Sequence, residues 1–195
     1  MLNFGDDIKN YIKFNSKQKI WSINDEDGEV VQISPPRFII DLERLITAWL
    51  YFREGQAPSI ILDVDGVKAP EPDGGNHKRG FVVDTFSPEL GVRDFTSCSY
   101  NLKKAIKLVY AEFEKGRETH TGEVPVISVT GHIDAPSQYG LNYQPIFAVT
   151  GWVARPVELG GAATIQTLDT VEPKQIDVAQ VNAPLTDDLN DTVPF

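Results

Sequence analysis

Aromatic and cationic side chains recur two residues apart at three places in the chain. These places are Lys19 with Trp21, Trp49 with Tyr51 and Arg53, and Arg79 with Phe81. In a β-strand, residues two apart share one face, so each place would set a flat ring beside a positive charge. Single-stranded nucleic acids bind such surfaces, because bases stack on the rings and cations follow the phosphates. The same pattern also occurs where a half-buried side chain covers the edge of a core, so both interpretations stay open.

Further candidate contacts lie at the ends of expected strands. They are Arg37, Lys78, Phe86, Arg93 and Tyr143. Arg93 follows a Pro88–Gly91 turn, where it could bind a phosphate, and Tyr143 belongs to an aromatic loop that either contacts bases or only closes a hairpin. Lys103, Lys104 and Lys107 lie off the apolar stripe of an expected helix, where they either solvate its outer face or add to the cationic surface.

The last nine residues combine acidic and apolar side chains. Three carboxylates come just before an apolar end in the set Asp187, Asp188, Asp191, Val193, Pro194 and Phe195. A partner protein could pair its cations with the carboxylates and take the phenyl ring into an apolar slot. The sequence therefore predicts a protein-interaction tip.

The composition is that of a globular protein with no recognisable enzymatic motif. The 195 residues are 41% hydrophobic and 24% charged, which is enough for a sizeable core. No phosphate-binding loop, nucleophile elbow or zinc-protease motif is present, so we expect a protein without enzymatic activity and without a cofactor. The three histidines and single cysteine lack metal-ligand spacing, and no apolar run of about 18 residues would span a membrane. The absence of a signal-like start predicts a cytoplasmic protein, in the host cell if a phage encodes it.

The net charge of −10 argues against nucleic-acid binding, because phosphate contacts need lysine and arginine. The charge is uneven along the chain. Residues 157–195 carry −6 with Lys174 as their single basic residue, whereas residues 1–156 carry only −4. A mildly acidic body can still present a basic groove on one face.

Hydrophobic patterning predicts a mainly β fold with one helix. Residues 18–33 indicate a hairpin around an Asp-Gly turn, and strands are expected near 47–52, 59–62, 78–86, 93–98, 124–131 and 143–153. A short helical turn should open at Asp41. Leu102, Ile106, Val109 and Phe113 form the stripe of a helix over about 100–115. We expect an oligonucleotide-binding (OB)-like five-stranded barrel with extra hairpin strands.

The chain divides into a folded body and a tail. Pro156 is expected to end the body, which gives a domain at 1–156 and a tail at 157–195. The tail has almost no aromatic residues before Phe195, so it cannot bury enough apolar surface to offset its ordering entropy. The sequence therefore predicts a disordered acidic tail.

Two parts of this chain resemble phage single-stranded DNA-binding proteins of an OB-fold family. The tip ending Val193-Pro194-Phe195 is one, although Asn190 and Thr192 interrupt the longer acidic run usual in the family. The other consists of body segments in matching order, over about residues 30–156. These segments are 38–43, 49–58, 78–81, 142–147 and 151–153. The resemblance implies an OB domain that binds single strands without sequence preference and a tail that recruits replication and recombination proteins.

The sequence thus leads to one principal hypothesis and two competitors. The principal hypothesis is a protein that coats single-stranded DNA during phage replication or recombination and recruits replication proteins through its tip; the sequence leaves open whether it forms a homo-oligomer. The first competitor is an acidic adaptor or DNA mimic that binds proteins rather than DNA. The second is an enzyme or small-ligand binder whose site local motifs do not reveal.

Overall fold

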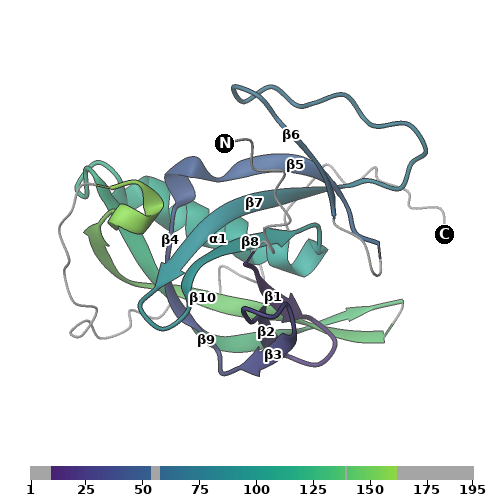
Figure 1. The fold of residues 1–195 in the computed structure, drawn as a ribbon, viewed down its shortest axis with the longest axis horizontal. Coiled ribbons are helices and arrows are strands. Elements are labelled where there is room, and N and C mark those ends of the chain that lie inside the picture. The colour runs from purple at the N-terminus through teal and green to yellow at the C-terminus, as the bar shows by residue number, and fades with distance from the viewer. Residues whose placement is uncertain (1–9, 54–57, 139, 162–195) are drawn as a thin grey trace.

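The computed structural model describes residues 10–53, 58–138 and 140–161, and these form two antiparallel sheets and one helix (Figure 1). The elements in chain order are β1 (Ile12–Asn15), β2 (Ile20–Asn24), β3 (Val30–Ile33), β4 (Arg37–Ile40), η1 (Leu42–Arg44), β5 (Ile46–Tyr51), β6 (Ser59–Leu62), β7 (Lys78–Ser87), β8 (Gly91–Ser97), α1 (Tyr100–Gly116), β9 (Glu123–Ser137), β10 (Gly140–Ala154) and η2 (Val157–Leu159). The predicted mainly β class with one long helix is confirmed.

The larger sheet has the strand order β10-β9-β4-β7-β5-β6, and β8 also pairs with β7. Residues 78–82 of β7 pair with β5, and residues 81–87 pair with β8. The β5–β6–β7 end and the β9–β10 hairpin project from the body as two separate arms (Figure 1). The smaller sheet, β1-β2-β3, lies near the base of the second arm.

The described strands do not close into the predicted barrel. The two sheets meet through isolated bonds rather than a ladder: Tyr11 bridges to Asp94, the Asp94 amide donates to the Asn10 carbonyl at 2.8 Å, and the Tyr143 amide donates to the Ser16 carbonyl at 2.7 Å. A closed OB-like barrel would continue the strand pairing across these points. The fold is therefore mainly β with two linked sheets.

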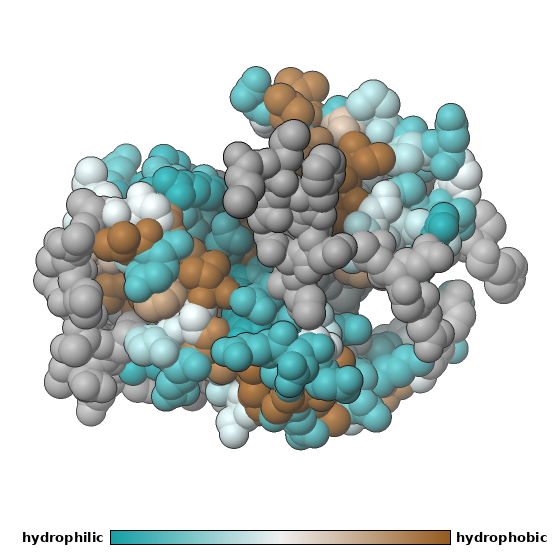
Figure 2. Space-filling model, viewed as in Figure 1, coloured by the Kyte–Doolittle hydropathy of each residue, from teal (hydrophilic) through white to brown (hydrophobic). Residues whose placement is uncertain are grey.

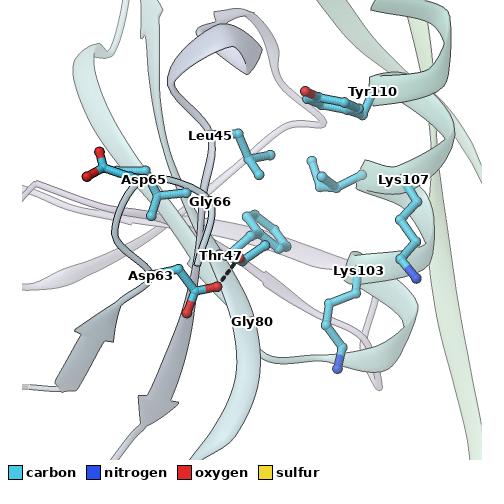
Figure 3. Close-up of a pocket in the computed structure, with 12 residues that line it drawn as sticks. Leu45, Thr47, Asp63, Asp65, Gly66, Gly80, Lys103, Lys107 and Tyr110 are labelled. Carbon is cyan, nitrogen blue, oxygen red and sulfur yellow. Dashed lines mark hydrogen bonds between the residues drawn. The ribbon is translucent and has the colours of Figure 1, made fainter. Parts of the chain in front are cut away.

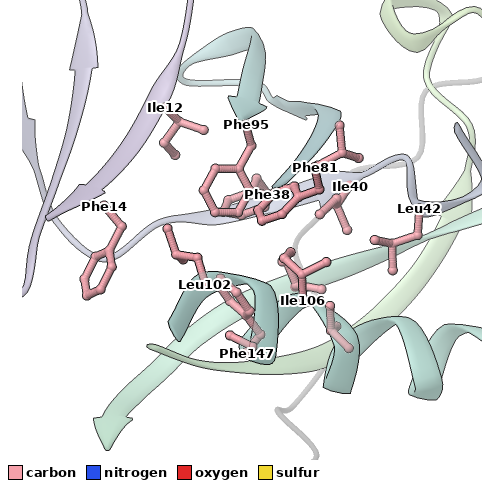
Figure 4. Close-up of a cluster of buried hydrophobic side chains, with 14 of the residues drawn as sticks. Ile12, Phe14, Phe38, Ile40, Leu42, Phe81, Phe95, Leu102, Ile106 and Phe147 are labelled. Atoms are coloured by element: carbon pink, nitrogen blue, oxygen red, sulfur yellow. The ribbon is translucent and has the colours of Figure 1, made fainter. Parts of the chain in front are cut away.

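The core lies between the sheets and α1. Figure 4 shows the side chains of Leu102 and Ile106 on α1 meeting Phe38, Phe81 and Phe95 from the strands. Phe95 packs edge-on against Phe81 at a ring distance of 5.3 Å. Edge-to-face packing of this kind adds to the roughly 1.5–3 kcal/mol that burial of each large apolar side chain contributes. The periodic stripe predicted for the helix is the face that packs here.

Several predicted elements appear with shifted bounds. The hairpin over 18–33 forms as β2 and β3, and the helical turn after Asp41 forms as η1 and leads into β5. Strand β1 was not predicted. The last two strands each run to 15 residues, with register shifts at Ile146/Phe147 and Val149/Gly151. The first shift lies directly after Pro145, a residue type that usually interrupts strands, whereas Pro136 pairs with Leu141 without a shift.

The packed chain continues beyond the predicted boundary at Pro156. Leu159 is buried against Ile39, Val124 and Val126, and Arg44 Nη1 donates to the Leu159 carbonyl at 2.7 Å. The Arg155 guanidinium pairs with the buried Asp41 carboxylate at 3.0 Å. These contacts hold the chain to the body as far as Leu159. Both the expected tail from residue 162 onward and its tip, Asp187 to Phe195, lie outside the described residues.

Candidate nucleic-acid interface

The β5–β6–β7 arm carries one face of aromatic and cationic side chains. Trp49 and Tyr51 lie on β5, and Arg79 is the register partner of Trp49 on β7. The Arg79 guanidinium lies 5.2 Å from the Trp49 ring centroid and that of Arg53 lies 4.7 Å from the Tyr51 centroid. Trp49 and Tyr51 lie two residues apart on β5, as predicted, and Arg53 stacks on Tyr51 from two residues beyond the end of the strand. We call Trp49, Tyr51, Arg53, Lys68 and Arg79 the cation–aromatic face.

The segment after β6 folds over this face. Trp49 Nε1 donates to the Ala69 carbonyl at 2.9 Å, and Lys68 Nζ lies 5.1 Å from the Trp49 centroid. The His77 ring contacts the Tyr51 ring at 5.5 Å, and its Nε2 lies 3.0 Å from Ser59 Oγ. Trp49 is consequently almost covered, whereas Tyr51 is half-buried and Arg53 is exposed.

A single carboxylate holds Arg79 in place. The Asp63 carboxylate accepts hydrogen bonds from both terminal guanidinium nitrogens of Arg79. It also accepts hydrogen bonds from the Thr47 hydroxyl and the Ala69 amide. Its side chain is only 7% exposed. The hydrogen bonds from Arg79 hold the pKa of Asp63 well below its ordinary value, and those from Thr47 and Ala69 add to this effect. Asp63 therefore stays ionised and anchors the 63–69 segment to both β5 and β7.

The junction between β7 and α1 adds further cations. Lys78 is exposed at the start of β7, on the face opposite Arg79. Burial raises the pKa of the Cys98 thiol, and the positive charges of Lys78 and Lys103 partly offset that rise. Gly80 allows the close approach of strands here, because a Cβ at this position would overlap the Leu50 side chain and the Ser97 carbonyl.

A second cation–aromatic contact lies beside the β9–β10 arm. Lys19 Nζ stands 3.9 Å from the centroid of the Tyr143 ring. Nearby, the His132 ring on β9 stacks on Phe14 at 5.4 Å, and its pKa is lowered by burial first and by the charge of Lys19 second. Figure 2 shows mainly hydrophilic residues at the lower centre of this view, where the small β1-β2-β3 sheet lies. The two cation–aromatic contacts thus lie on different arms.

Two predicted stacking residues belong to the core instead. Trp21 and Phe81 are 1% and 3% exposed, so neither ring presents a face to a base in this fold. Lys19 precedes β2 with a φ of +60°. This left-handed turn breaks the strand alternation, so Lys19 packs on Tyr143 while Trp21 points into the core. The expected pairing of Lys19 with Trp21 on one face is therefore corrected.

Three other predicted contacts lie apart from the cation–aromatic face. The Arg93 guanidinium donates to the carbonyls of Leu90 and Asn24, which ties β8 to the end of β2. Phe86 packs against the second apolar cluster near Leu159. Arg37 is exposed on β4 opposite Ser128. The structure thus gives Arg93 and Phe86 packing roles and leaves Arg37 accessible on another strand.

Sequence reasoning missed Lys68, His77 and Asp63. Asp63 and Lys68 come from residues 63–76, a stretch rich in Asp, Gly and Pro between two predicted strands, and His77 follows it directly. The Asp-Val-Asp-Gly start of this stretch resembles a calcium loop but serves as the anchor for Arg79. The described residues contain no group of three or more His, Cys, Asp or Glu side chains placed to hold a metal ion. Across the same residues no helix has the length and apolarity needed to cross a membrane.

No family model, curated protein or solved structure matches this chain. The class of the molecule therefore rests on its own fold and surface: a mainly β protein with cation–aromatic contacts on two projecting arms.

Proposed function

We propose that this protein binds single-stranded DNA without sequence preference. The supporting observation is the cation–aromatic face, where Arg53 stacks on a half-exposed Tyr51 beside Lys68 and Arg79. Rings accept any base by stacking, and cations accept any phosphate, so such a surface has no need of base-specific hydrogen bonds. Lys19 on Tyr143 offers a second contact of the same kind on the other arm.

The biological setting of the proposal rests on the sequence alone. The resemblance to phage single-stranded DNA-binding proteins supports a role in replication or recombination. The acidic segment ending in Phe195 supports recruitment of replication proteins through a basic, apolar pocket on the partner. Clustering of acidic residues toward the end of the chain leaves the body free to carry the cationic face.

A salt titration with a matched pair of arginine variants tests the proposal. A fluorescent oligothymidine is titrated with the full chain at several salt concentrations, and log affinity should fall linearly with log salt. Arg53→Ala should weaken binding and reduce the slope by about 0.7, the value for one lost phosphate contact on a single strand. Arg117→Ala is the control, because Arg117 also lies over a ring, that of Phe113, but at the far end of α1.

The two principal outcomes separate the candidate functions. Salt-dependent affinity that Arg53→Ala weakens and Arg117→Ala leaves intact supports DNA binding. A full chain without measurable affinity for the oligothymidine at low salt would overturn the proposal and favour the acidic adaptor or DNA mimic.

A further inference from the structure

A groove of about 540 Å³ lies between α1 and the strands of the first arm. One wall is α1, with Lys103, Ile106, Lys107 and Tyr110, and the other includes Leu45, Ile46 and Thr47 at the start of β5 (Figure 3). Phe81 on β7 lines the inner part, and the turn at Asp63, Asp65 and Gly66 lines the outer edge. Its volume falls within the range of about 300–1,000 Å³ typical of small-ligand sites.

The groove combines an apolar interior with a cationic opening. Leu45, Ile46, Ile106 and Phe81 supply the apolar surface, and Tyr110 supplies a ring that is 37% exposed. Lys103 and Lys107 are four residues apart, which sets them on one face of the helix. In Figure 3 the side chains of both lysines extend downward from α1, and that of Lys103 lies nearer the turn at Asp63. The site therefore suits a flat, weakly polar body that carries an anionic group at its edge.

The groove is continuous with the cation–aromatic face. Thr47 and Asp63 line the groove, and they are also hydrogen-bonded to each other in the cluster that holds Arg79 over Trp49. A nucleic-acid strand that stacks on Tyr51 and runs along β5 toward Thr47 would thus meet the groove next.

We propose that this groove is a nucleotide subsite that takes one base of the bound single strand. The base packs between the Tyr110 ring and the apolar wall of Leu45 and Ile46, and its phosphate pairs with Lys103 and Lys107. This inference rests on the proposed function and adds a specific anchor to it, because a base held in a groove contributes more than a base stacked on an open face.

Charge favours a nucleotide over an acidic peptide as the occupant. A nucleotide brings one phosphate for each apolar ring, and that phosphate can sit at the lysine side. A peptide with clustered carboxylates would also bring negative charge against Asp63 and Asp65 on the opposite edge. The charges around the groove therefore match a nucleotide.

Photochemical crosslinking locates the contact. The full chain bound to oligothymidine is irradiated with ultraviolet light and digested with trypsin. A crosslink is expected at Tyr110, in the fragment from Leu108 to Lys115. Crosslinks confined to other aromatic residues, such as Tyr51 or Tyr143, would overturn the proposal.

Two pairs of variants test the energetics. Tyr110→Ala should weaken oligothymidine binding about 5- to 100-fold, the range for loss of one stacking ring, while Tyr110→Phe should stay within about twofold of the parent. Lys107→Glu should weaken binding more than Lys115→Glu, which makes the same charge change on the same helix. Lys115 lies about 12 Å further along the axis, paired with Glu112. The comparison of Lys107→Glu with Lys115→Glu still tests the subsite if Tyr110→Ala fails to fold.

Failure of this inference is distinguishable from failure of the proposed function. If Arg53→Ala weakens binding while the Tyr110 and Lys107 variants do not, the strand bypasses the groove and the subsite is wrong. If the parent protein binds no oligothymidine, the subsite falls together with the proposed function.

Discussion

Asp63 is the residue on which the geometry of the cation–aromatic face depends. Its carboxylate pairs with Arg79 and accepts hydrogen bonds from Thr47 and from the Ala69 amide. The last of these positions the Ala69 carbonyl to accept the hydrogen bond from Trp49 Nε1. Arg79 is thereby engaged by a carboxylate within the protein. Arg53 and Lys68 are exposed, so they are the more accessible cations of the face.

Replacing this carboxylate should remove stability in a pH-dependent way. Asp63→Asn should lower the free energy of unfolding at pH 7 by about 1.5–3 kcal/mol, the range for hydrogen bonds to a charged group. Because the folded pKa of Asp63 is depressed, its contribution is complete above the unfolded value of about 3.9 and is lost as the pH falls toward the folded pKa. Urea unfolding at pH 7 and pH 3 should show the difference between parent and variant shrinking at pH 3.

The neighbouring Asp65 provides the control for this experiment. Asp65 is exposed in the same turn, so Asp65→Asn should change stability by less than about 0.5 kcal/mol at either pH. A variant Asp63→Asn as stable as the parent at pH 7 would mean that the Arg79 pair contributes nothing net.

Individual residues show how far sequence patterns reach. Period-two spacing placed Trp49, Tyr51 and Arg53 on one face; β5 holds the first two, and Arg53 stacks on Tyr51 from just beyond the strand. The same rule failed at Lys19 and Trp21, because a left-handed residue just before the strand changes the alternation. Spacing also says nothing about which face of a strand is covered, and for this reason Trp21 and Phe81 could not be assigned to the core in advance.

At the scale of elements, local signals predicted most of the fold and long-range signals did not. The helix, the β2–β3 hairpin and the β7–β8 pair each arise from adjacent residues and match their predictions. The groove could not be foreseen, because it depends on α1 lying across β5 and β7, which are far from it in sequence. Asp63 and Arg79 are likewise brought together only by the pairing of β5 with both β6 and β7.

The contact between β1 and β9 should make stability sensitive to mild acid. The His132 ring stacks on Phe14, and its pKa is lowered by burial and by Lys19. Below the ordinary histidine pKa of about 6.5, the unfolded chain takes up a proton more readily than the folded one. The free energy of unfolding therefore decreases as the pH is lowered from about 6.5 to the folded pKa. His132→Phe keeps a ring on Phe14 and cannot titrate. Thermal melts at pH 7.5 and 5.5 should show a smaller loss for this variant than for the parent.

An equal loss of melting temperature in parent and variant would show that His132 does not carry this acid sensitivity. His120→Phe is the comparison variant, because His120 also stacks flat on a ring, that of Trp152. His120 Nδ1 also lies 2.6 Å from Glu123 Oε2, at the start of the β9 strand and away from His132.

At the scale of the whole molecule, the packed body ends later than the sequence indicates. A chain that stops at Pro156 lacks Leu159, whose burial contributes about 1.5–3 kcal/mol, and also loses the hydrogen bond from Arg44. We expect it to melt about 5–10 °C below a chain that stops at Gly161. Calorimetry of the two truncated chains measures this difference, and equal melting temperatures would make η2 dispensable.

The truncation at Gly161 also tests how the acidity of the chain acts on binding. Residues 162–195 carry −5 of the net charge of −10. We predict that these acids compete with phosphates for the cationic face, because covalent attachment gives them an effective concentration near the millimolar range. Removing them should therefore tighten oligothymidine binding at about 0.05 M salt and change it little near 1 M, where the screening length is about 3 Å. If the full and shortened chains bind oligothymidine equally well at low salt, the acidic segment does not compete with DNA for the cation–aromatic face.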